Sequence, residues 1–335
     1  MKIIIPMAGM GKRMRPHTLV TPKPLIELAG KPIVHHIVEE LARTAKEPIE
    51  EIGFVVGRFG EKAEKMLIEI AEKVGAKGSI FYQDEPLGTA HAVLCAEPLL
   101  NGKVIVAFAD TIFKAEFKID MEGDSTIFVQ EVEDPRAFGV VKLNEKNEIT
   151  DFVEKPQHFV SNLAIIGIYY FKDGDNLKKE INFLIDNDIK EKGEYQLTNA
   201  LENMKQKGLV FKPGKVDEWL DCGNKDATVH THGRVLELYP EKRSIHSTAI
   251  IENSTIIQPC FIGEGAKIID SVVGPGVSIG KLSHIENSVV KRSIVQQNTT
   301  IKNVIVHNSM VGNNVVWLQK PADASIGDFT SLINE

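Results

Sequence analysis

The first half of the chain alternates between short apolar runs and longer segments in which apolar residues recur every three or four positions. The short runs predict buried strands, and the periodic segments predict amphipathic helices. Strands are predicted at residues 3–5, 52–56 and 79–82, and helices at 31–44 and 61–74. This rhythm indicates a parallel sheet flanked by helices, in which ligands bind at the carboxyl ends of the strands.

A different pattern begins near residue 240, where the helical period ends. Isoleucines then recur six positions apart, and an Asn or Asp followed by Ser recurs every seventeen. The isoleucines are Ile250, Ile256, Ile262 and Ile268, then Ile279 and Ile285, and the polar pairs begin at Asn253, Asp270 and Asn287. A period of six nested in one of seventeen indicates three short strands per coil of a hexapeptide-repeat parallel β-helix. The sequence therefore predicts two domains, residues 1–240 and 241–335.

The open ends of such a β-helix are edges that need capping or pairing. We therefore expect the second domain to assemble a homo-oligomer.

Composition narrows the class of partner. The chain has 335 residues and a net charge of −7, which argues against nucleic acid, because proteins that neutralise many phosphates are normally basic over the whole domain. No stretch approaches ~18 consecutive apolar residues and the N-terminus has no export signal, so we expect neither membrane insertion nor secretion. Three distant cysteines, Cys95, Cys222 and Cys260, fit a reducing cytoplasm and indicate no zinc site.

Positive charge gathers in the loop that follows the first strand. Gly9 and Gly11 let backbone N–H groups approach an anion, and Lys12, Arg13 and, ten residues later, Lys23 supply the charge that a triphosphate needs. The pattern is neither a Walker A loop nor a dinucleotide fingerprint, which needs a glycine where Met14 stands. The sequence predicts a phosphate loop of another type. The alternative is a tight strand-to-helix turn with solvated basic residues.

Two polar segments follow later strands of the predicted sheet. Gln83 can read the edge of a base through its amide, while Gly88 lets the backbone close on that base and Thr89 opens a helix. Asp110 ends an apolar strand and offers the hard oxygen ligand that Mg²⁺ requires. The alternatives are a plain turn with a Thr cap for the first segment, and a helix-capping Asp for the second.

The motif Gly9-Met10-Gly11-Lys12-Arg13-Met14, followed by Pro22-Lys23-Pro24, resembles the signature of the sugar-1-phosphate nucleotidylyltransferases. The resemblance continues through residues 136–141, 152–156 and 161–169, which match the sugar-phosphate site of that family. It ends with Trp219-Leu220-Asp221-Cys222-Gly223, which resembles the segment that brings a second metal carboxylate. This chain departs from the family at Ala109, which replaces a glycine, and at Ile166, which replaces a threonine.

The resemblance implies a mostly parallel, Rossmann-like α/β sheet of the GT-A type followed by a left-handed β-helix. It implies catalytic roles for Arg13 and Lys23, and Mg²⁺ binding by Asp110 and Asp221. The implied nucleotide-binding residues are Ala8, Gly9, Gly11, Lys12, Gln83, Gly88 and Thr89, and the implied sugar-phosphate residues are Gly139, Glu154, Lys155 and Ile165. A surface Glu-Lys pair before a proline is the alternative interpretation of Glu154 and Lys155.

These observations predict an enzyme that joins a nucleoside triphosphate and a sugar 1-phosphate into a nucleotide-sugar and releases pyrophosphate. The segment from Ser161 to Tyr169 looks closest to glucose-1-phosphate thymidylyltransferases, which favours dTTP and glucose 1-phosphate. Residues 5–9 and 87–90 have counterparts among uridylyl enzymes, so UTP with glucose 1-phosphate or N-acetylglucosamine 1-phosphate is the alternative. A catalytically silent regulatory subunit would be expected to lose its charged site residues, which are present here. Acyl transfer in the β-helix would depend on His284 or His307.

Overall fold

The computed structural model describes residues 1–115 and 123–331, which form two compact units. The first unit contains Met1–Glu27 and Lys31–Thr231, and the second contains Leu28–Gly30 and the chain from His232 onward. The division falls inside helix α6 (Lys225–Leu238), and the predicted boundary at residue 240 lies just after this helix. Each unit has its own buried hydrophobic cluster.

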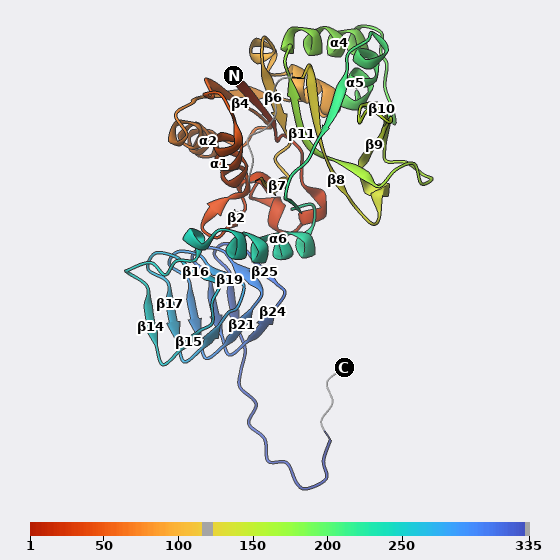
Figure 1. Cartoon of the computed structure of the whole chain (residues 1–335). Coiled ribbons are helices and arrows are strands. Elements are labelled where there is room, and N and C mark those ends of the chain that lie inside the picture. Colours follow the sequence, from red (N-terminus) through yellow and green to blue (C-terminus); the bar gives the residue numbers. More distant parts are fainter. Residues whose placement is uncertain (116–122, 332–335) are drawn as a thin grey trace. The chain divides into compact units, whose positions relative to one another are not determined.

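The first unit is built on a mixed sheet with the strand order β10-β9-β11-β6-β1-β4-β5 (Figure 1). Its parallel part contains β1 (Lys2–Pro6), β4 (Glu51–Val56), β5 (Lys77–Tyr82) and β6 (Val104–Ala107). The other strands are β8 (Ser125–Glu131), β9 (Gly139–Leu143), β10 (Ile149–Glu154), β11 (Leu163–Phe171) and β12 (Phe211–Gly214). The three strands predicted at residues 3–5, 52–56 and 79–82 are β1, β4 and β5, and the predicted α/β fold class is confirmed.

Helices flank this sheet, and the first three connect its parallel strands. They are α1 (Ile33–Thr44), α2 (Glu61–Lys73), α3 (Thr89–Leu94), α4 (Gly174–Asp186) and α5 (Leu197–Gln206). The first two are the helices predicted at residues 31–44 and 61–74. Helix α1 follows Pro32, and it buries Ile33, Ile37 and Leu41, whose spacing places them on one face.

A pair of short strands brings distant segments of the first unit together. Strand β7 (Thr111–Lys114) pairs antiparallel with β13 (Glu218–Asp221), so that Thr111 faces Asp221. The residues just before β7 and at the end of β13 therefore lie side by side. A second short pair is formed by β2 (Glu27–Leu28) and β3 (Lys31–Pro32).

The core of the first unit joins its sheet to α3, α4 and α5. Ile4 and Val106 from the central strands, Val93 from α3, Leu177 from α4 and Leu201 from α5 are all completely buried in one cluster. Burial of side chains of this size contributes about 1.5–3 kcal/mol each. The sheet that carries the predicted phosphate loop is therefore held rigidly.

The second unit is a parallel β-helix with three sheets, as predicted (Figure 1). One sheet contains β14 (Ile250–Glu252), β17 (Lys267–Ile269), β20 (His284–Glu286), β23 (Thr300–Lys302) and β26 (Val316–Leu318). The next contains β15 (Thr255–Ile256), β18 (Val272–Val273), β21 (Val289–Lys291) and β24 (Ile305–His307). The third contains β16 (Cys260–Ile262), β19 (Val277–Ile279), β22 (Ser293–Val295) and β25 (Met310–Val311).

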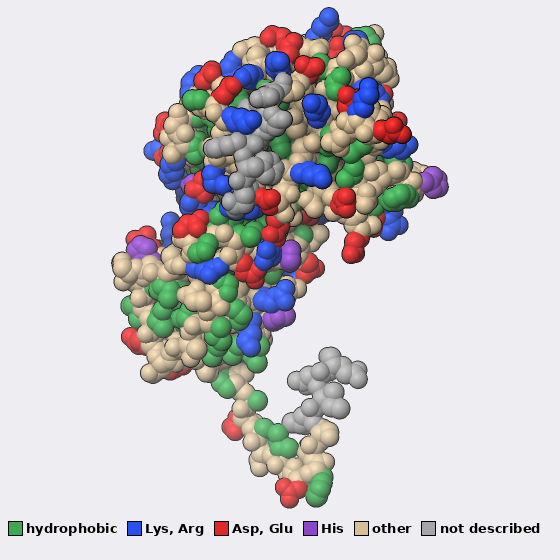
Figure 2. Space-filling view, in the orientation of Figure 1, with side chains coloured by type: hydrophobic (Ala, Val, Ile, Leu, Met, Phe, Trp, Pro, Cys, Tyr) green, Lys and Arg blue, Asp and Glu red, His purple; other side chains and the backbone are tan. Residues whose placement is uncertain are grey.

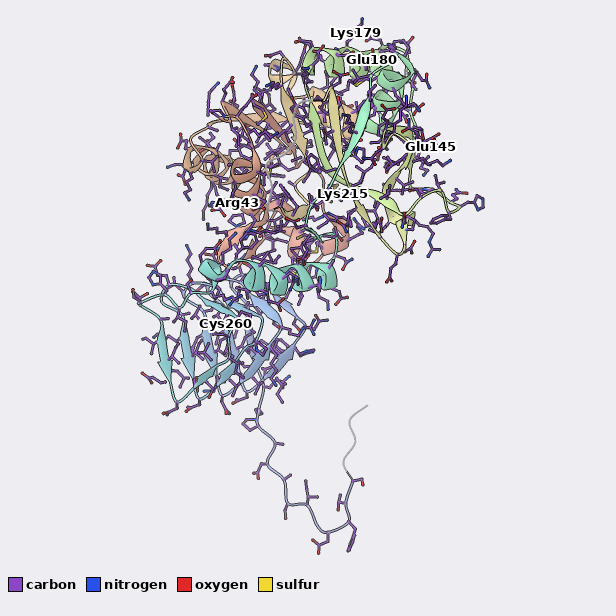
Figure 3. The ribbon with its side chains drawn as sticks, in the orientation of Figure 1. Arg43, Glu145, Lys179, Glu180, Lys215 and Cys260 are labelled. Atoms are coloured by element: carbon purple, nitrogen blue, oxygen red, sulfur yellow. The ribbon has the colours of Figure 1, made fainter. Side chains whose placement is uncertain are left out.

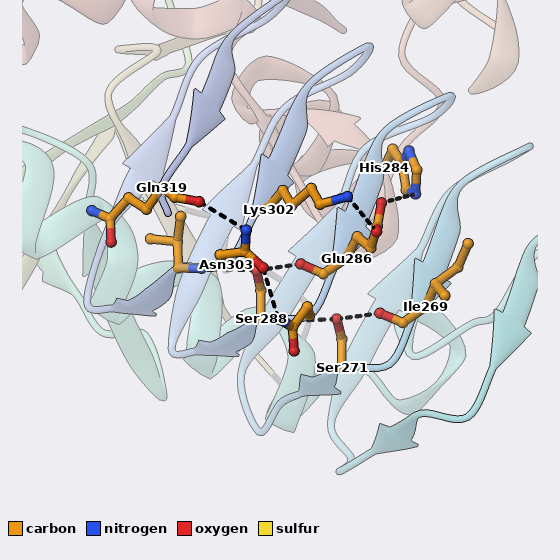
Figure 4. Close-up of polar contacts among 10 residues, drawn as sticks. Ile269, Ser271, His284, Glu286, Ser288, Lys302, Asn303 and Gln319 are labelled. Carbon is orange, nitrogen blue, oxygen red and sulfur yellow. Dashed lines mark hydrogen bonds and ion pairs between the residues drawn. The ribbon is translucent and has the colours of Figure 1, made fainter. Parts of the chain in front are cut away.

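The coils of the β-helix stack through apolar side chains inside and serine hydroxyls at a corner. Ile268, Ile285 and Cys260 are completely buried in the interior, and Figure 3 labels Cys260 among the coils. At the corner, the Ser271 hydroxyl accepts a hydrogen bond from the Ser288 backbone N–H at 3.0 Å and donates one to the Ile269 carbonyl at 2.7 Å (Figure 4). Each coil thus satisfies polar backbone groups of the next.

The described surface of the first unit mixes positive and negative side chains on the face seen in Figure 2. None of the helices within residues 1–115 and 123–331 combines the length and the apolar character needed to cross a membrane.

Candidate active site

The predicted phosphate loop leaves the carboxyl end of β1 and enters a short 3-10 helix, η1 (Lys12–Met14). Gly11 adopts a left-handed backbone conformation with φ of 56°, and a Cβ there would lie 3.1 Å from side-chain atoms of both Lys23 and Thr18. The Thr18 hydroxyl donates a hydrogen bond to the Gly11 carbonyl at 2.8 Å, and Met14 is buried beneath the loop. A residue larger than glycine at position 11 would therefore displace Lys23 or Thr18.

Two adjoining cavities lie at this end of the sheet, with volumes of about 420 and 260 Å³. They share Arg13, Thr89, Phe108, Asp110 and Glu194, so a ligand in one cavity can contact a ligand in the other. The first cavity also contains Ala8, Gly9, Gly11, Lys12, Lys23, Gln83 and Gly88, and the second also contains Gly139, Glu154, Lys155, Ile165 and Asp221. Every site residue predicted from the sequence thus lines one cavity or both.

Two aspartates and a buried lysine meet where the cavities join. Lys23 Nζ lies 3.2 Å from Asp110 Oδ2, and the lysine side chain is only 9% exposed. The pairing of β7 with β13 brings Asp221 beside Asp110, and the Cys222 backbone N–H donates to the Asp110 carbonyl at 3.0 Å. Burial raises the pKa of Asp221 and the Asp110 charge raises it further, while a hydrogen bond from the Gly223 backbone opposes this shift.

This arrangement fits a Mg²⁺ ion that takes most of its ligands from water and phosphate. Among the described residues, no group of three or more His, Cys, Asp and Glu side chains could hold a metal. Two neighbouring carboxylates suit such an ion, because Mg²⁺ keeps several waters and binds through one or two carboxylates and substrate phosphates. A bound cation would also offset the burial and the Asp110 charge, both of which raise the pKa of Asp221.

Cys222 lies next to Asp221 but has no chemical role in this arrangement. Burial raises the pKa of its thiol to about 12, so it stays protonated at neutral pH. It packs as a small apolar side chain.

Gln83 and Gly88 line the first cavity and not the second. Gln83 follows β5, and its backbone N–H donates to the Val56 carbonyl at 2.9 Å. Gly88 has φ of 121°, and a Cβ there would lie 2.5 Å from the Tyr195 carbonyl oxygen, so only glycine fits. The close approach of residues 88 and 195 fixes this part of the cavity.

Thr89 begins α3, as predicted, and its hydroxyl forms hydrogen bonds within the protein. Its hydroxyl accepts a hydrogen bond from the Leu197 backbone at 2.9 Å and donates one to Gln196 Oε1 at 3.1 Å. The hydroxyl therefore joins α3 to α5, and a ligand would meet the backbone or methyl group of this residue.

The second cavity has acidic, basic and aromatic walls. Lys155 Nζ lies 3.2 Å from Glu154 Oε1, and the Lys155 side chain is 56% exposed against 16% for Glu154. The rings of Phe138 and Trp219, which line the same cavity, pack edge to face with centroids 5.0 Å apart. Gly139 leaves space beside Glu154, because a Cβ would lie 3.0 Å from Glu154 Oε2.

Several lining residues have no role in the sequence prediction. Glu194 lines both cavities, Phe108 lies between them, and Tyr169 is buried in the wall of the second. Burial, followed by the charges of Glu154 and Asp110, raises the pKa of Tyr169. Glu194 lies three residues before the start of α5, and its position before a helix was the available signal.

Two family models match this chain and together cover almost all of it. The nucleotidyl transferase model matches residues 2–237, and the model for the GlmU-like C-terminal hexapeptide domain matches residues 238–323.

Known proteins agree with these matches. A bifunctional protein GlmU from Methanococcus maripaludis is 31% identical over 332 residues, covering 87% of this chain and 77% of that protein. A glucose-1-phosphate thymidylyltransferase from Streptomyces antibioticus is 28% identical, covering 86% of this chain and 85% of that protein. The structure of a nucleoside-diphosphate-sugar pyrophosphorylase from Vibrio cholerae shares the fold, with a TM-score of 0.59 and 20% identity over 69% of this chain and 99% of that one. The chain therefore belongs to the sugar-1-phosphate nucleotidyltransferase family and carries a GlmU-like left-handed β-helix at its C-terminal end.

Proposed function

We propose that this chain transfers the nucleotidyl group of dTTP to glucose 1-phosphate, which yields dTDP-glucose and pyrophosphate. The observation that supports this reaction best is the pair of cavities that meet at Arg13 and Asp110. The phosphate loop lines one cavity, and Lys155 with Glu154 lines the other. Two anionic substrates can therefore bind next to each other, with their phosphates at the junction.

The reaction needs no nucleophile from the protein. A phosphate oxygen of the sugar phosphate attacks the α-phosphorus of the triphosphate, and the bond from that phosphorus to the bridging oxygen of the departing pyrophosphate breaks. Such displacements are accelerated mainly by positioning and by neutralising charge. Two unit charges ~4 Å apart repel by about 1 kcal/mol in water and several times that in a partly dry cleft, so cationic side chains are essential.

Three cations divide this task in the proposed mechanism. Arg13, which lines both cavities, stabilises the leaving pyrophosphate, and Lys23 holds the α-phosphate region. Lys155 binds the phosphate of the sugar, and Glu154 accepts hydrogen bonds from sugar hydroxyls.

Asp110 and Asp221 would hold the Mg²⁺ ion. When bound, this ion neutralises phosphate charge and orients the phosphates of the two substrates. Lys23 already balances the charge of Asp110 at 3.2 Å, and Asp221 is the carboxylate that lacks such a close cation in the described structure.

The choice of dTTP rests on the likeness of residues 161–169 to thymidylyl enzymes and on the Streptomyces relative named for that activity. UTP is the competing substrate, because one methyl group in an apolar pocket is worth only ~1–3 kcal/mol. The first cavity offers Pro86 and Ala92 beside Gln83, which are apolar neighbours for either pyrimidine.

Pyrophosphate release with five nucleoside triphosphates, each combined with glucose, mannose and N-acetylglucosamine 1-phosphates, tests this proposal. We expect the highest kcat/KM for dTTP with glucose 1-phosphate. A preference for UTP above about tenfold would overturn the thymidylyl assignment. A discrimination of that size would show that the pocket selects against the methyl group of thymine. No release with any pair would support a catalytically silent subunit.

We further propose that the β-helix assembles copies of this chain. Hydrophobic side chains gather on the surface of this unit in Figure 2. The register of the second sheet aligns Thr255, Val272, Val289 and Ile305 in one outward row, and Ile305 is 81% exposed. Light scattering of the wild type and of Ile305→Asp tests this, because a charge in a buried contact should shift the population toward monomer.

The two histidines considered for acyl transfer lie in different sheets of the β-helix. His284 is on β20, where its Nε2 lies 3.6 Å from Glu286 Oε2 (Figure 4), and His307 is on β24. The geometry gives no support to a shared acyl-transfer site.

A further inference from the structure

The side-chain amide of Gln83 is held in one orientation by two acceptors. Its Nε2 atom lies 3.1 Å from the Gly88 carbonyl oxygen and 3.1 Å from His91 Nδ1. Gln83 lines the first cavity, whereas His91, on α3, does not. His91 therefore contacts the residue that faces the ligand without facing the ligand itself.

The Gly88 carbonyl decides which end of the amide points toward it. A carbonyl oxygen only accepts hydrogen bonds, so the NH₂ group of Gln83 must face it, and the reversed amide would set two oxygens against each other. The carbonyl cannot turn away, because the Gly88 backbone lies against Tyr195 and Ala92 donates to this same oxygen at 3.0 Å.

The Nδ1 atom of His91 accepts a hydrogen bond from the second hydrogen of the Gln83 NH₂ group. To accept it, Nδ1 must be unprotonated, so the neutral imidazole carries its proton on Nε2. Both amide hydrogens are then engaged within the protein, and Oε1 has no hydrogen-bond partner among residues 1–115 and 123–331. The Gly88 backbone N–H is also without a partner in the described chain. The site therefore presents one acceptor and one donor.

We propose that His91 is a positioning residue that holds Gln83 Oε1 toward the base and makes the site select bases with an imide N–H. This inference rests on the proposed function, because it assumes that a pyrimidine binds at Gln83. Uracil and thymine carry a hydrogen at N3 beside a carbonyl oxygen, and these match Gln83 Oε1 and the Gly88 N–H. Cytosine carries a lone pair at N3, which would face the lone pairs of Oε1. Rejection of cytosine is thus enforced jointly by the Gly88 carbonyl and by a histidine that does not line the cavity.

Two substitutions at position 91 distinguish the effect of the hydrogen bond to Gln83 from the effect of side-chain packing. In His91→Asn, the side-chain oxygen occupies nearly the same place as Nδ1 and can accept the same bond. In His91→Leu, the shape is similar and the acceptor is lost. In His91→Leu, the amide hydrogen that His91 accepted has no partner, so the Gln83 amide is less well fixed. The loss of one neutral hydrogen bond changes a binding equilibrium by about tenfold.

Steady-state kinetics with dTTP, UTP and CTP for the wild type and both variants test the proposal. We expect His91→Leu to raise the KM for dTTP and UTP about tenfold and to lower the preference over CTP by a similar factor, with kcat changed by less than about twofold. His91→Asn should stay within about threefold of the wild type in all of these quantities.

Three outcomes would overturn the proposal, and one of them also removes the proposed function. A wild type that uses neither dTTP nor UTP would refute the pyrimidine assignment itself. A wild type that uses them while His91→Leu keeps its preference over CTP would refute only the role of His91. Equal losses in His91→Asn and His91→Leu, with unchanged thermal unfolding, would assign the effect to ring packing instead of to hydrogen bonding.

Discussion

Lys23 Nζ lies 3.2 Å from Asp110 Oδ2, although the two residues are 87 positions apart in the sequence. The Lys23 side chain is 9% exposed and the Asp110 side chain is 50% exposed. The lysine is therefore held by surrounding protein atoms, whereas the carboxylate remains accessible from the cavity. Removing the lysine would leave the Asp110 charge without its nearest described cation.

We predict that Lys23→Met lowers kcat by at least about a hundredfold, because a charge-assisted contact to a phosphate and to Asp110 is lost in a partly buried site. Initial rates of pyrophosphate release measure this. The matched control is Lys77→Met, since Lys77 is 70% exposed and pairs with Glu51 at 2.9 Å on the surface. Exposed pairs contribute about 0–1 kcal/mol, so this variant should behave as the wild type. Equal activity in both variants would contradict the role of Lys23.

Asp221→Asn should separate activity from stability. Burial and the nearby Asp110 charge raise the pKa of Asp221, which means that its ionised form is unfavourable in the folded protein. Folding therefore becomes less favourable as pH rises above the ordinary pKa of this carboxyl, and a neutral amide should remove that penalty. We therefore expect the variant to be at least as stable as the wild type in metal-free buffer at neutral pH.

The same variant should lose turnover by at least about a hundredfold, because metal stabilisation of the transition state is worth several kcal/mol. Thermal unfolding with and without Mg²⁺ completes the measurement. Mg²⁺ should raise the unfolding temperature of the wild type and have little effect on Asp221→Asn. The exposed Asp175 on α4 provides the control, since Asp175→Asn should change neither activity nor the response to metal. A stabilising effect of Mg²⁺ that survives in Asp221→Asn would refute this ligand.

Local sequence signals predicted much of the site because its residues lie within a few positions of strand ends. Gly11, Gln83 and Asp110 were predicted from such signals together with the family resemblance, and all three line the first cavity. The amide orientation of Gln83 and the use of the Thr89 hydroxyl could not be found, because they depend on hydrogen bonds to His91 and to residues 196 and 197. The sequence does not encode those contacts in any short-range pattern.

The predicted repeat of seventeen residues per coil holds for the early coils of the β-helix and shortens to sixteen in the later ones. Ile268 and Ile285 are seventeen residues apart, but Ile285 is followed after sixteen by Ile301 in the same sheet. The difference lies at one corner. Three residues, 274–276, separate Val273 from Val277. In the next coil, only Lys291 and Arg292 separate Val290 from Ser293, which are the residues paired with Val273 and Val277. A fixed repeat therefore cannot be extended through the whole domain.

His232 makes the stability of the second unit dependent on pH. It is completely buried, its Nε2 lies 2.6 Å from Ser278 Oγ, and burial lowers its pKa from 6.5 to about 3. Below about pH 6.5, the unfolded chain binds a proton at this residue and the folded chain does not, so stability falls as pH decreases toward 3. Between about pH 7.5 and about pH 5.5, the free energy of unfolding should fall by roughly 1 kcal/mol through this group.

His232→Gln keeps a polar atom near the position of Nε2 and cannot titrate, so it should lose this part of the pH dependence. Denaturant unfolding in a Trp219→Phe background lets Trp317, on β26, report on the second unit. The control is His230→Gln on the same helix, because His230 is exposed and should leave the pH dependence unchanged. The same slope in His232→Gln and the wild type would show that other groups cause the acid sensitivity.

The backbone conformation of Lys155 decides which substitution best tests the sugar-phosphate site. Its φ is +43°, a conformation in which Asn is tolerated far better than most side chains, and its backbone N–H donates to the Phe138 carbonyl at 3.1 Å. Lys155→Asn therefore removes the charge with little added backbone strain. Substitution by Ala would remove the charge and disturb the turn together.

We expect Lys155→Asn to raise the KM for the sugar phosphate by about tenfold to a hundredfold, because a hydrogen bond to a charged group is worth about 1.5–3 kcal/mol. The KM for the triphosphate should change by less than about twofold, since Lys155 lines only the second cavity. Lys142→Asn, at an exposed position on β9, is the control for removal of a positive charge from the same lobe. A parallel loss of affinity for both substrates would mean that Lys155 contacts the triphosphate, and unchanged kinetics would mean that its exposed side chain does not reach the sugar phosphate.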